Sequence, residues 1–323
     1  MKLLEVKNLK TYFNISSGQV KAVDDVSFDL DYGESLGLVG ESGCGKTTSA
    51  LSIVQLLPKE GKIYGGEILL EGVDLAKLSD SEMQRYRWNE ISLVFQGAMN
   101  ALNPVQRIGK QISEAIVLHH QLGNEEALKK AGDILELVEI PRERLMNYPH
   151  EFSGGMKQRV MIAMALACNP KIIIGDEPTT ALDVMVQAQI LNLIEKLRKE
   201  FKMGFILITH DLSILAETCD KIAIMYAGKI VEMAEAEELF SNPVHPYTKK
   251  LISCFPDMKG ERKIKEGIPG TPPNMIDLPG GCHFAPRCEH ATDRCKQETP
   301  CIIEVKKKHY VSCHNWEVIN NEQ

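Results

Sequence analysis

Long apolar runs are absent from this sequence. No stretch reaches the roughly 18 consecutive apolar residues that predict a membrane-spanning helix. The most apolar segment, 161–174, is interrupted by Asn169, Pro170 and Lys171, so it predicts a helix, a turn and a short strand. Residues 1–7 carry scattered charges and lack the apolar core of a secretory signal. We therefore expect a cytoplasmic protein without a membrane span.

An excess of positive charge is also absent. The 37 Lys and Arg residues against 44 Asp and Glu residues give a formal net charge of −7 and a pI near 5.8. This balance excludes a basic nucleic-acid coat and gives no general attraction to anionic membranes. Hydrophobic residues make up 44% and charged residues 25%, which is typical of globular chains, and a length of 323 residues predicts about two domains.

The sequence has no internal repeat and no low-complexity tract, but its cysteines are unevenly spread. Five of the nine cysteines lie within residues 282–323. In a chain without an export signal, such a cluster favours metal binding over disulfides. The clustered residues are Cys282, Cys288, Cys295, Cys301 and Cys313.

The order of the predicted elements indicates an α/β core. Mostly apolar strands separated by helices predict a parallel sheet that is covered on its faces. A mainly helical segment, 104–168, is inserted in this core, and after about residue 240 frequent Pro and Gly predict a separate tail module. The individual predictions are strands within 3–38 and at 35–39, 91–95, 171–174 and 205–208, two short strands within 63–73, and helices at 47–57, 79–90 and 187–200.

A glycine-rich turn follows the strand predicted at 35–39. Residues 40–47, Gly-Glu-Ser-Gly-Cys-Gly-Lys-Thr, match the phosphate-loop pattern G-x-x-x-x-G-K-[ST] between a strand and a helix. The glycines allow backbone N–H groups to turn toward anionic oxygens, and the helix N-terminus adds positive potential. We expect Lys46 to reach the β- and γ-phosphates of a nucleotide and Thr47 to ligate Mg²⁺.

Two acids follow the strand predicted at 171–174. Asp176 and Glu177 stand at the carboxyl end of this strand, the edge where ligands bind in open α/β sheets. Asp176 is predicted to hold Mg²⁺, and Glu177 is predicted to polarise the attacking water. The alternative is a solvated pair of acids at a strand end, which the presence of a phosphate loop disfavours.

A second phosphate site is predicted in front of an apolar helix. Ser153, Gly154 and Gly155 precede this helix, which Ser153 is able to cap, and the helix N-terminus suits phosphate. One chain then carries two phosphate-binding helix ends but one lysine-bearing loop. This predicts two subunits that each close the other's nucleotide.

Together these motifs resemble the ATP-binding subunit of an ABC transporter. The resemblance covers residues 1–240 and implies an ATPase with an α/β P-loop NTPase core of ABC type. It also implies an N-terminal antiparallel β subdomain, a helical subdomain at about 97–168, and a small irregular Cys-rich C-terminal domain at 241–323. The motifs in chain order are the phosphate loop 40–47, Gln96, the signature 153–157, Asp176-Glu177, Ala181-Leu-Asp183 and His210.

The resemblance implies a head-to-tail dimer that encloses two ATP molecules. The second ATP-binding subunit is either identical or a close homologue. Ser153, Gly154 and Gly155 would contact the γ-phosphate bound to the opposite subunit, and Asp183 would order the dimer interface.

The resemblance also implies roles around the nucleotide. Gln96 would touch Mg²⁺ or the lytic water, and His210 would hold the γ-phosphate and orient Glu177. Phe13 resembles the aromatic residue that stacks on adenine, with Tyr12 as the alternative. The residues expected to contact the nucleotide or its Mg²⁺ are Phe13, Gly40, Ser42, Gly43, Cys44, Gly45, Lys46, Thr47, Thr48, Gln96, Ser153, Gly154, Gly155, Asp176 and Asp183.

Residues 101–105, 175–184, 187–191 and 242–252 resemble the peptide-importing branch of this family. The resemblance implies import of dipeptides or oligopeptides, at the cytoplasmic face of the cell membrane, with two transmembrane permeases. An extracellular solute-binding protein would take part indirectly, and no nucleic acid is expected. The alternatives are a nickel-importing relative and a soluble ABC ATPase that acts on DNA or ribosomes.

The cysteine-rich tail matches the same branch. The resemblance implies a [4Fe–4S] cluster held by Cys282, Cys288, Cys295 and Cys313. Four thiolates also hold zinc, but these spacings are wider than the short pairs of structural zinc sites and favour iron–sulfur. Free cysteines that pack a small tail are a further alternative, and Cys301 either replaces one ligand or stays free.

Overall fold

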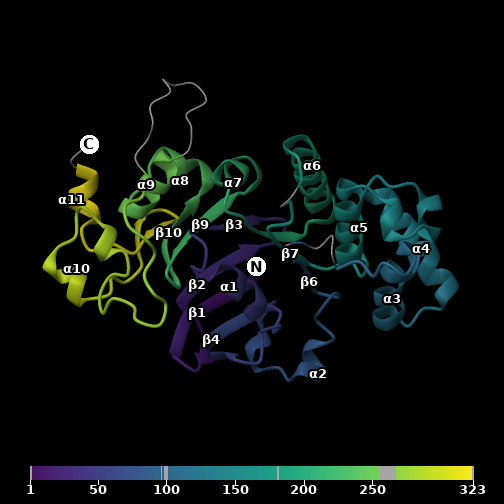
Figure 1. Cartoon of the computed structure of the whole chain (residues 1–323), viewed down its shortest axis with the longest axis horizontal. Helices are drawn as coiled ribbons and strands as arrows, with labels where there is room; N and C mark the ends of the chain where they lie inside the picture. The colour runs from purple at the N-terminus through teal and green to yellow at the C-terminus, as the bar shows by residue number, and fades with distance from the viewer. Residues whose placement is uncertain (1, 96, 98–100, 180–181, 255–266, 322–323) are drawn as a thin grey trace. The chain divides into compact units, whose positions relative to one another are not determined.

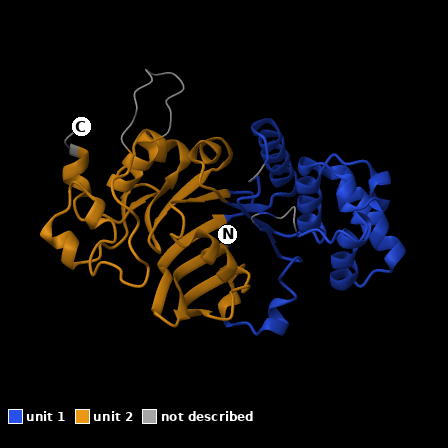
Figure 2. Cartoon of the chain, viewed as in Figure 1, with its two compact units in different colours: residues 1–3, 31–34, 77–207 blue, residues 4–30, 35–76, 208–323 orange. Residues whose placement is uncertain are grey.

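In a computed structural model, the chain divides into two compact units (Figure 2). The structure describes residues 2–95, 97, 101–179, 182–254 and 267–321. The domain boundary predicted near residue 240 lies inside the second unit, and the domain limits stay a prediction. Unit 1 contains residues 1–3, 31–34 and 77–207, and unit 2 contains residues 4–30, 35–76 and 208–323.

Unit 2 contains an antiparallel sheet in the order β2-β1-β4-β5 (Figure 1). Leu4, Val6, Leu9 and Thr11 of β1 are buried, while the residues between them are half-buried or exposed, so one face of the strand joins the core. The register shifts after Lys7, where the alternation skips a residue. The strands are β1 (Lys2–Ile15), β2 (Gly18–Asp31), β4 (Gly61–Leu70) and β5 (Val73–Asp74).

The other strands of unit 2 follow the order β11-β12-β10-β9-β3. β3 runs parallel to β9, and the other pairs are antiparallel. All residues of β3 are buried, as its apolar sequence predicts. The strands are β3 (Ser35–Val39), β9 (Lys221–Tyr226), β10 (Lys229–Glu235), β11 (Ile303–Lys306) and β12 (His309–Val311).

The tail is more regular than its sequence predicts. Its strand β12 pairs with β10, with Glu232 opposite Val311, so the tail extends a sheet of unit 2 (Figure 1). The fully buried Glu232 and His309 reinforce this pairing, since Oε1 of the first lies 2.7 Å from Nε2 of the second. Strands of four and three residues are too short for a periodic pattern, which is why the sequence did not reveal them.

Among its described residues, unit 1 contains three strands and the predicted helical segment. Ile91 of β6 lies opposite Ile172 of the parallel strand β7, and β8 is the neighbour of β7 on its other side. The helix predicted at 187–200 is present as α6 and is slightly longer. The elements are β6 (Ile91–Val94), β7 (Ile172–Asp176), β8 (Gly204–Ile208), α3 (Ile108–His120), α4 (Asn124–Leu137), α5 (Gly154–Leu166) and α6 (Val184–Phe201).

The helix predicted at 79–90 is wrong in length, because α2 covers only Asp80–Met83. The Ser79 hydroxyl accepts from the Glu82 N–H (3.4 Å), and the Glu82 carboxylate accepts from the Ser79 N–H (2.8 Å). This capping box starts the helix. Trp88 then adopts a left-handed φ of 67°, which is incompatible with a continuing helix.

The remaining helices are short, and the longest of them, α1 and α9, have eight residues each. Among the described residues, no helix combines the length and apolarity needed to cross a bilayer. Their bounds are α1 (Lys46–Ile53), η1 (Leu75–Lys77), η3 (Arg142–Met146), η4 (Pro149–Glu151), α7 (Leu212–Thr218), α8 (Ala236–Ser241), α9 (Pro246–Ser253), η5 (Ala285–Arg287), α10 (Asp293–Gln297) and α11 (Trp316–Asn321).

Candidate functional site

In unit 2, the buried strand β3 leads directly into the loop at 40–45 and then into α1. The N-cap residue of α1 makes no side-chain hydrogen bond to the helix, so no side chain competes there for the first-turn N–H groups. Such a helix start suits an anion. Ser42 and Thr47 are exposed and Thr48 is half-buried, which leaves their hydroxyls on the accessible side of the loop.

Lys46 lies against the backbone of its own loop and is only 9% exposed. Its Nζ donates to the carbonyl oxygens of Gly40 (2.7 Å) and Glu41 (3.1 Å) and lies 3.6 Å from the Cys44 sulfur. Burial raises the pKa of the Cys44 thiol, so this neighbour is a neutral, small side chain. Phosphate oxygens would be stronger acceptors for the ammonium group than these carbonyls, because they carry charge.

Two glycines of the loop are required by the space around them. A Cβ on Gly40 would overlap the carbonyl oxygen of Met225, and a Cβ on Gly45 would overlap that of Ala22. Gly43 differs, since its φ is 78° but nothing lies within 4 Å of its Cβ position. The loop therefore approaches the backbone of two other segments of unit 2 more closely than any larger residue would permit.

The sheet places Phe13 and Tyr12 on opposite faces of β1. The hydroxyl of Thr11 lies 2.8 Å from that of Ser52 in α1, so the face that carries residues 11 and 13 is the face toward the phosphate-loop helix. Phe13 is on this face. Tyr12 is on the other face, where its hydroxyl donates to Asp24 (2.6 Å) and burial, first among the causes, raises its pKa.

In unit 1, β7 ends in the acids that the sequence singled out. Asp176 is 4% exposed, and Glu177 follows it half-buried with a φ of 47°. A left-handed conformation costs a residue with a side chain about 1–2 kcal/mol. Strain of this kind persists where the surrounding structure enforces it, and it clusters at functional sites.

The signature segment begins α5 as predicted. The Ser153 hydroxyl accepts from the Met156 N–H (3.4 Å) and caps the helix, while Ser153 and Gly154 are exposed. Gly155 has a different reason for its lack of a side chain. Its Cβ would lie 2.7 Å from Cγ1 of Val186, so α5 packs closely on the first turn of α6.

Asp183 caps that same helix, α6. Its Oδ1 accepts from the Val186 N–H at 2.9 Å, and the residue itself is exposed. The next two residues, Val184 and Met185, are 79% and 73% exposed. Two adjacent apolar side chains are therefore exposed at the start of α6, next to the signature helix.

The remaining predicted residues are divided between the units. His210 follows β8, is exposed and belongs to unit 2, as does the phosphate loop, whereas Asp176, Glu177 and the signature belong to unit 1. Gln96 and Ala181 lie outside the described residues.

Four of the five tail cysteines line one cavity in unit 2. These are Cys282, Cys288, Cys295 and Cys313. Cys301 is not among the lining residues and is exposed. The structure therefore brings together the four residues that the sequence predicted as ligands and separates the fifth from them.

The spacing of these sulfur atoms bears on what the cavity suits. In the part of the chain that the structure describes, no three of them lie within 4.8 Å of one another. A zinc ion with Zn–S bonds of about 2.3 Å would place its sulfurs about 3.8 Å apart. Burial, with the other thiols adding, raises the pKa of Cys282 to about 11 and that of Cys313 to about 12. As placed, the four sulfurs are not all at the spacing of one tetrahedral zinc site, and a cationic centre would favour their thiolate forms.

No local pattern in the sequence predicts a contact between the tail and the phosphate loop. Arg287 precedes Cys288 and forms two hydrogen bonds with Glu41, from Nη1 to Oε2 (2.6 Å) and from Nη2 to Oε1 (3.0 Å). The arginine side chain is 5% exposed. The two residues are 246 positions apart, and neither belongs to a local pattern that would have indicated the pairing.

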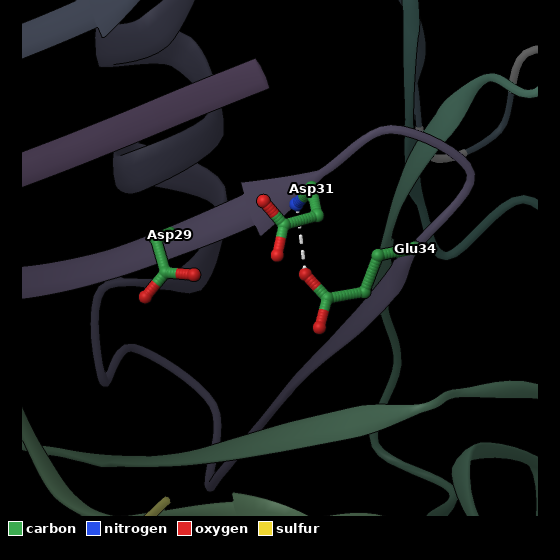
Figure 3. Close-up of side chains that lie close together, drawn as sticks. All are labelled: Asp29, Asp31 and Glu34. Carbon is green, nitrogen blue, oxygen red and sulfur yellow. Dashed lines mark hydrogen bonds between the residues drawn. The ribbon is translucent and has the colours of Figure 1, made fainter. Parts of the chain in front are cut away.

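Three acids at the end of β2 and in the turn after it are drawn in Figure 3. In unit 1, the Asp31 N–H donates to Glu34 (2.8 Å), and Lys2 pairs with Asp31 (3.0 Å). In unit 2, Lys221 pairs with Asp29 (3.2 Å). Each carboxylate thus has a partner within the protein, and we assign this group a structural role in the turn.

Two family models match the sequence. One is described as ABC transporter and covers residues 23–180, and the other is described as oligopeptide/dipeptide transporter, C-terminal region, and covers residues 231–295. The first match includes the phosphate loop and the signature, and the second includes Cys282, Cys288 and Cys295.

Similar proteins match over nearly the whole length. The sequence is 46% identical over 323 residues to the probable peptide ABC transporter ATP-binding protein y4tR of Sinorhizobium fredii, covering 98% of this chain and 96% of that protein. It is 46% identical over 300 residues to the oligopeptide transport ATP-binding protein OppD of Escherichia coli K12, covering 92% and 89%. The dimeric post-hydrolysis structure of the ATP-binding cassette MJ0796 bound to ADP and Pi matches with a TM-score of 0.65 at 28% identity, covering 72% of this chain and 98% of that one.

Proposed function

The chain belongs to the ATP-binding proteins of peptide ABC transporters, and we propose that it binds and hydrolyses ATP to power the import of dipeptides or oligopeptides. The predicted family, its ATPase activity and the ABC-type α/β P-loop core are confirmed. One observation carries the proposal: a phosphate loop at the end of a fully buried strand holds Lys46 against its backbone. It occurs in a chain that matches a peptide transport protein over 98% of its length.

In the proposed site, Lys46 and the first-turn N–H groups of α1 bind the phosphates of ATP. The exposed hydroxyl of Thr47 and the carboxylate of Asp176 are the oxygen ligands that Mg²⁺ prefers. Mg²⁺, when bound, neutralises charge that develops on the phosphate oxygens. These residues therefore position and neutralise the triphosphate.

Glu177 is the proposed general base. It follows Asp176 at the carboxyl end of β7 and is held there in a left-handed conformation. Its carboxylate would take the proton from the attacking water. We propose that His210 holds the γ-phosphate and orients Glu177, and that Gln96 contacts Mg²⁺ or the water.

The phosphate-binding signature is proposed to act on a second subunit. Ser153 and Gly154 are exposed at the start of α5, where N–H groups suit a phosphate of the opposite subunit. Asp183, Val184 and Met185 lie at the start of the neighbouring helix and are proposed to order the interface. The similar cassette MJ0796 is dimeric, which supports a partner ATPase, either identical or homologous.

Phe13 is the proposed adenine-stacking residue. It shares a strand face with Thr11, which contacts the phosphate-loop helix through Ser52. Tyr12 is the weaker candidate, because its hydroxyl is bonded to Asp24 on the other face. We propose that a ring on the strand face toward α1 stacks on a base whose phosphates bind at the start of α1.

The proposed partners are two transmembrane permeases, which would place the chain at the cytoplasmic face of the membrane. The helical segment α3–α5 would transmit closure of the ATPase dimer to the permeases. An extracellular solute-binding protein would deliver the peptide. The names of the peptide transport relatives support this arrangement.

Loss of the Lys46 ammonium group tests the function. A strain that lacks this chain should lose ATP-dependent uptake of a labelled oligopeptide, and the wild-type chain should restore it. Lys46→Ala should not restore uptake, because the triphosphate loses a buried charged donor. Expression is checked by immunoblot of the membrane fraction.

The same strain discriminates the alternatives. Restoration of peptide uptake by Lys46→Ala would contradict the proposal. Loss of Ni²⁺ uptake with peptide uptake unchanged would favour the nickel-importing relative. A chain that copurifies with ribosomes or DNA, and not with membrane subunits, would favour the soluble ATPase.

The tail cavity is proposed to hold a [4Fe–4S] cluster, with zinc as the alternative. Cys282, Cys288, Cys295 and Cys313 line it, and their sulfurs are spaced more widely than one tetrahedral ion requires. Four thiolates are the usual ligands of such a cluster. We propose a structural role, because the small tail has few large apolar side chains of its own.

A matched pair of variants tests this cluster. The wild-type chain, purified without oxygen, should contain iron and acid-labile sulfide and absorb in the charge-transfer range of iron–sulfur proteins. Cys282→Ser should remove iron and sulfide, since it removes a ligand. Cys301→Ser is the control and should leave both unchanged, because Cys301 is exposed and outside the cavity. Stoichiometric zinc without sulfide would show that the cavity holds zinc and not an iron–sulfur cluster.

A further inference from the structure

Glu41, the second residue of the phosphate loop, is held on three sides. Its N–H donates to the Tyr247 hydroxyl (3.1 Å), and its carboxylate accepts both hydrogen bonds from Arg287. Its carbonyl oxygen accepts from the Lys46 ammonium group (3.1 Å) and from the Cys44 N–H (3.3 Å). One residue therefore links the C-terminal extension to the lysine that is proposed to bind phosphate.

The Arg287 guanidinium is fixed by more than this ion pair. Nε donates to the Pro269 carbonyl oxygen (2.7 Å), and Nη1 also donates to the Tyr226 hydroxyl (3.2 Å). With 5% of its side chain exposed, it is shielded from water. Glu41 is half-buried, with 26% of its side chain exposed. A bidentate arginine–carboxylate pair combines charge with a fixed planar geometry, so the buried arginine orients the carboxylate as well as attracting it.

A packed aromatic cluster lies between the loop and the cysteine cavity. Tyr226, Tyr247 and Phe284 are each at most 1% exposed, with ring centroids 4.8 to 5.3 Å apart. Phe284 lines the cysteine cavity, and the Tyr247 hydroxyl reaches the Glu41 N–H. Close-packed side chains are hardly compressible and pass strain on to their neighbours. The loop and the tail therefore have little freedom to move independently.

We propose that Arg287 is a positioning residue for ATP binding, which acts through Glu41 to fix the loop backbone that holds Lys46. The C-terminal extension then contributes directly to the nucleotide site of its own chain. This inference rests on the proposed ATP-binding function but does not depend on which metal, if any, the cysteines hold. Without the arginine, the Glu41 carboxylate loses its charged partner, and the carbonyl oxygens around Lys46 lose their fixed position.

The test measures ATP affinity of the purified full chain. Arg287→Gln should raise the Kd for a fluorescent ATP analogue about 10-fold, a typical size for coupling between sites. Glu41→Gln should have a similar effect. The Kd of the double variant should be about the same as that of either single variant, because both substitutions remove the same interaction. In steady-state hydrolysis, KM for ATP should rise more than kcat falls, as expected for a group that prepares the loop for binding.

Arg294→Gln is the matched control. Arg294 belongs to the same extension and pairs with Glu298 at 2.8 Å, but its side chain is 64% exposed, and its loss should leave the Kd unchanged. Arg287→Lys keeps the charge without the bidentate geometry and should fall between the wild type and Arg287→Gln. Circular dichroism and melting temperature establish that each variant is folded.

The outcomes separate this inference from the proposed function. A wild-type chain that binds no ATP contradicts the function itself. Wild-type affinity in a folded Arg287→Gln chain overturns the inference while the function stands. If Arg287→Gln does not fold, Glu41→Gln removes the same ion pair from the loop side, and an unchanged Kd in that variant overturns the inference equally. Effects of the two single variants that multiply in the double variant would also overturn it.

Discussion

Glu177→Gln is expected to bind ATP and to hydrolyse it at least about 10²-fold more slowly than the wild type. The amide keeps the size of the side chain and its place at the end of β7, where the backbone φ is 47°. It cannot accept the proton of the attacking water, so turnover slows and the proposed nucleotide-bound dimer should persist. Phosphate release measures the rate, and size-exclusion chromatography with Mg²⁺ and ATP should show accumulated dimer.

Glu200→Gln provides the control for this prediction. It makes the same change of charge in unit 1, on an exposed position of α6. We expect normal hydrolysis and no accumulated dimer from it. Hydrolysis by Glu177→Gln at a nearly normal rate would show that another group acts as the base, while the ABC ATPase family assignment would be unaffected.

Gly45→Ala is expected to destabilise unit 2 and to abolish ATP binding. The new Cβ would overlap the Ala22 carbonyl oxygen, and the backbone φ of 111° is one that only glycine adopts without strain. Strain and overlap together should cost about 3 kcal/mol or more. The loop would have to shift at the residue before Lys46, which would displace the ammonium group from the triphosphate. Thermal unfolding and equilibrium ATP binding measure the two effects.

Gly43→Ala separates backbone strain from overlap. Gly43 has a φ of 78°, but nothing lies within 4 Å of its Cβ position. The substitution should therefore cost only the left-handed conformation, about 1–2 kcal/mol. Equal melting temperatures for the two variants, measured without nucleotide, would contradict the close approach of Gly45 to Ala22.

The sequence sufficed for the features that depend on consecutive residues. The phosphate loop, the acids after β7 and the serine cap of α5 are each set by a few neighbouring residues and the element on either side. Backbone dihedral preferences and capping act over this short range, so these features could be predicted before the fold was known. The family resemblance then supplied the proposed roles of His210 and Gln96, which no local pattern indicates.

Predictions from local sequence preference failed where contacts with residues distant in the sequence determine the local structure. Residues 79–90 have a helical pattern, yet only Asp80–Met83 form an α-helix, and Trp88, with a left-handed φ of 67°, lies in the turn before β6. The choice between Tyr12 and Phe13 also depended on pairing across strands. Alternation puts the two on opposite faces, but only the packing of β1 identifies the face toward α1.

The sequence by itself determined that this protein carries an ATP-binding loop, a signature helix and a cysteine-rich tail, because each is a local pattern. Only the tertiary structure decided that four cysteines share a cavity without Cys301, and that Arg287 of the tail pairs with Glu41 of the loop. Contacts between segments 246 residues apart depend on the path of the intervening chain. That path is fixed by the packing of many buried side chains together, which no short segment of sequence encodes.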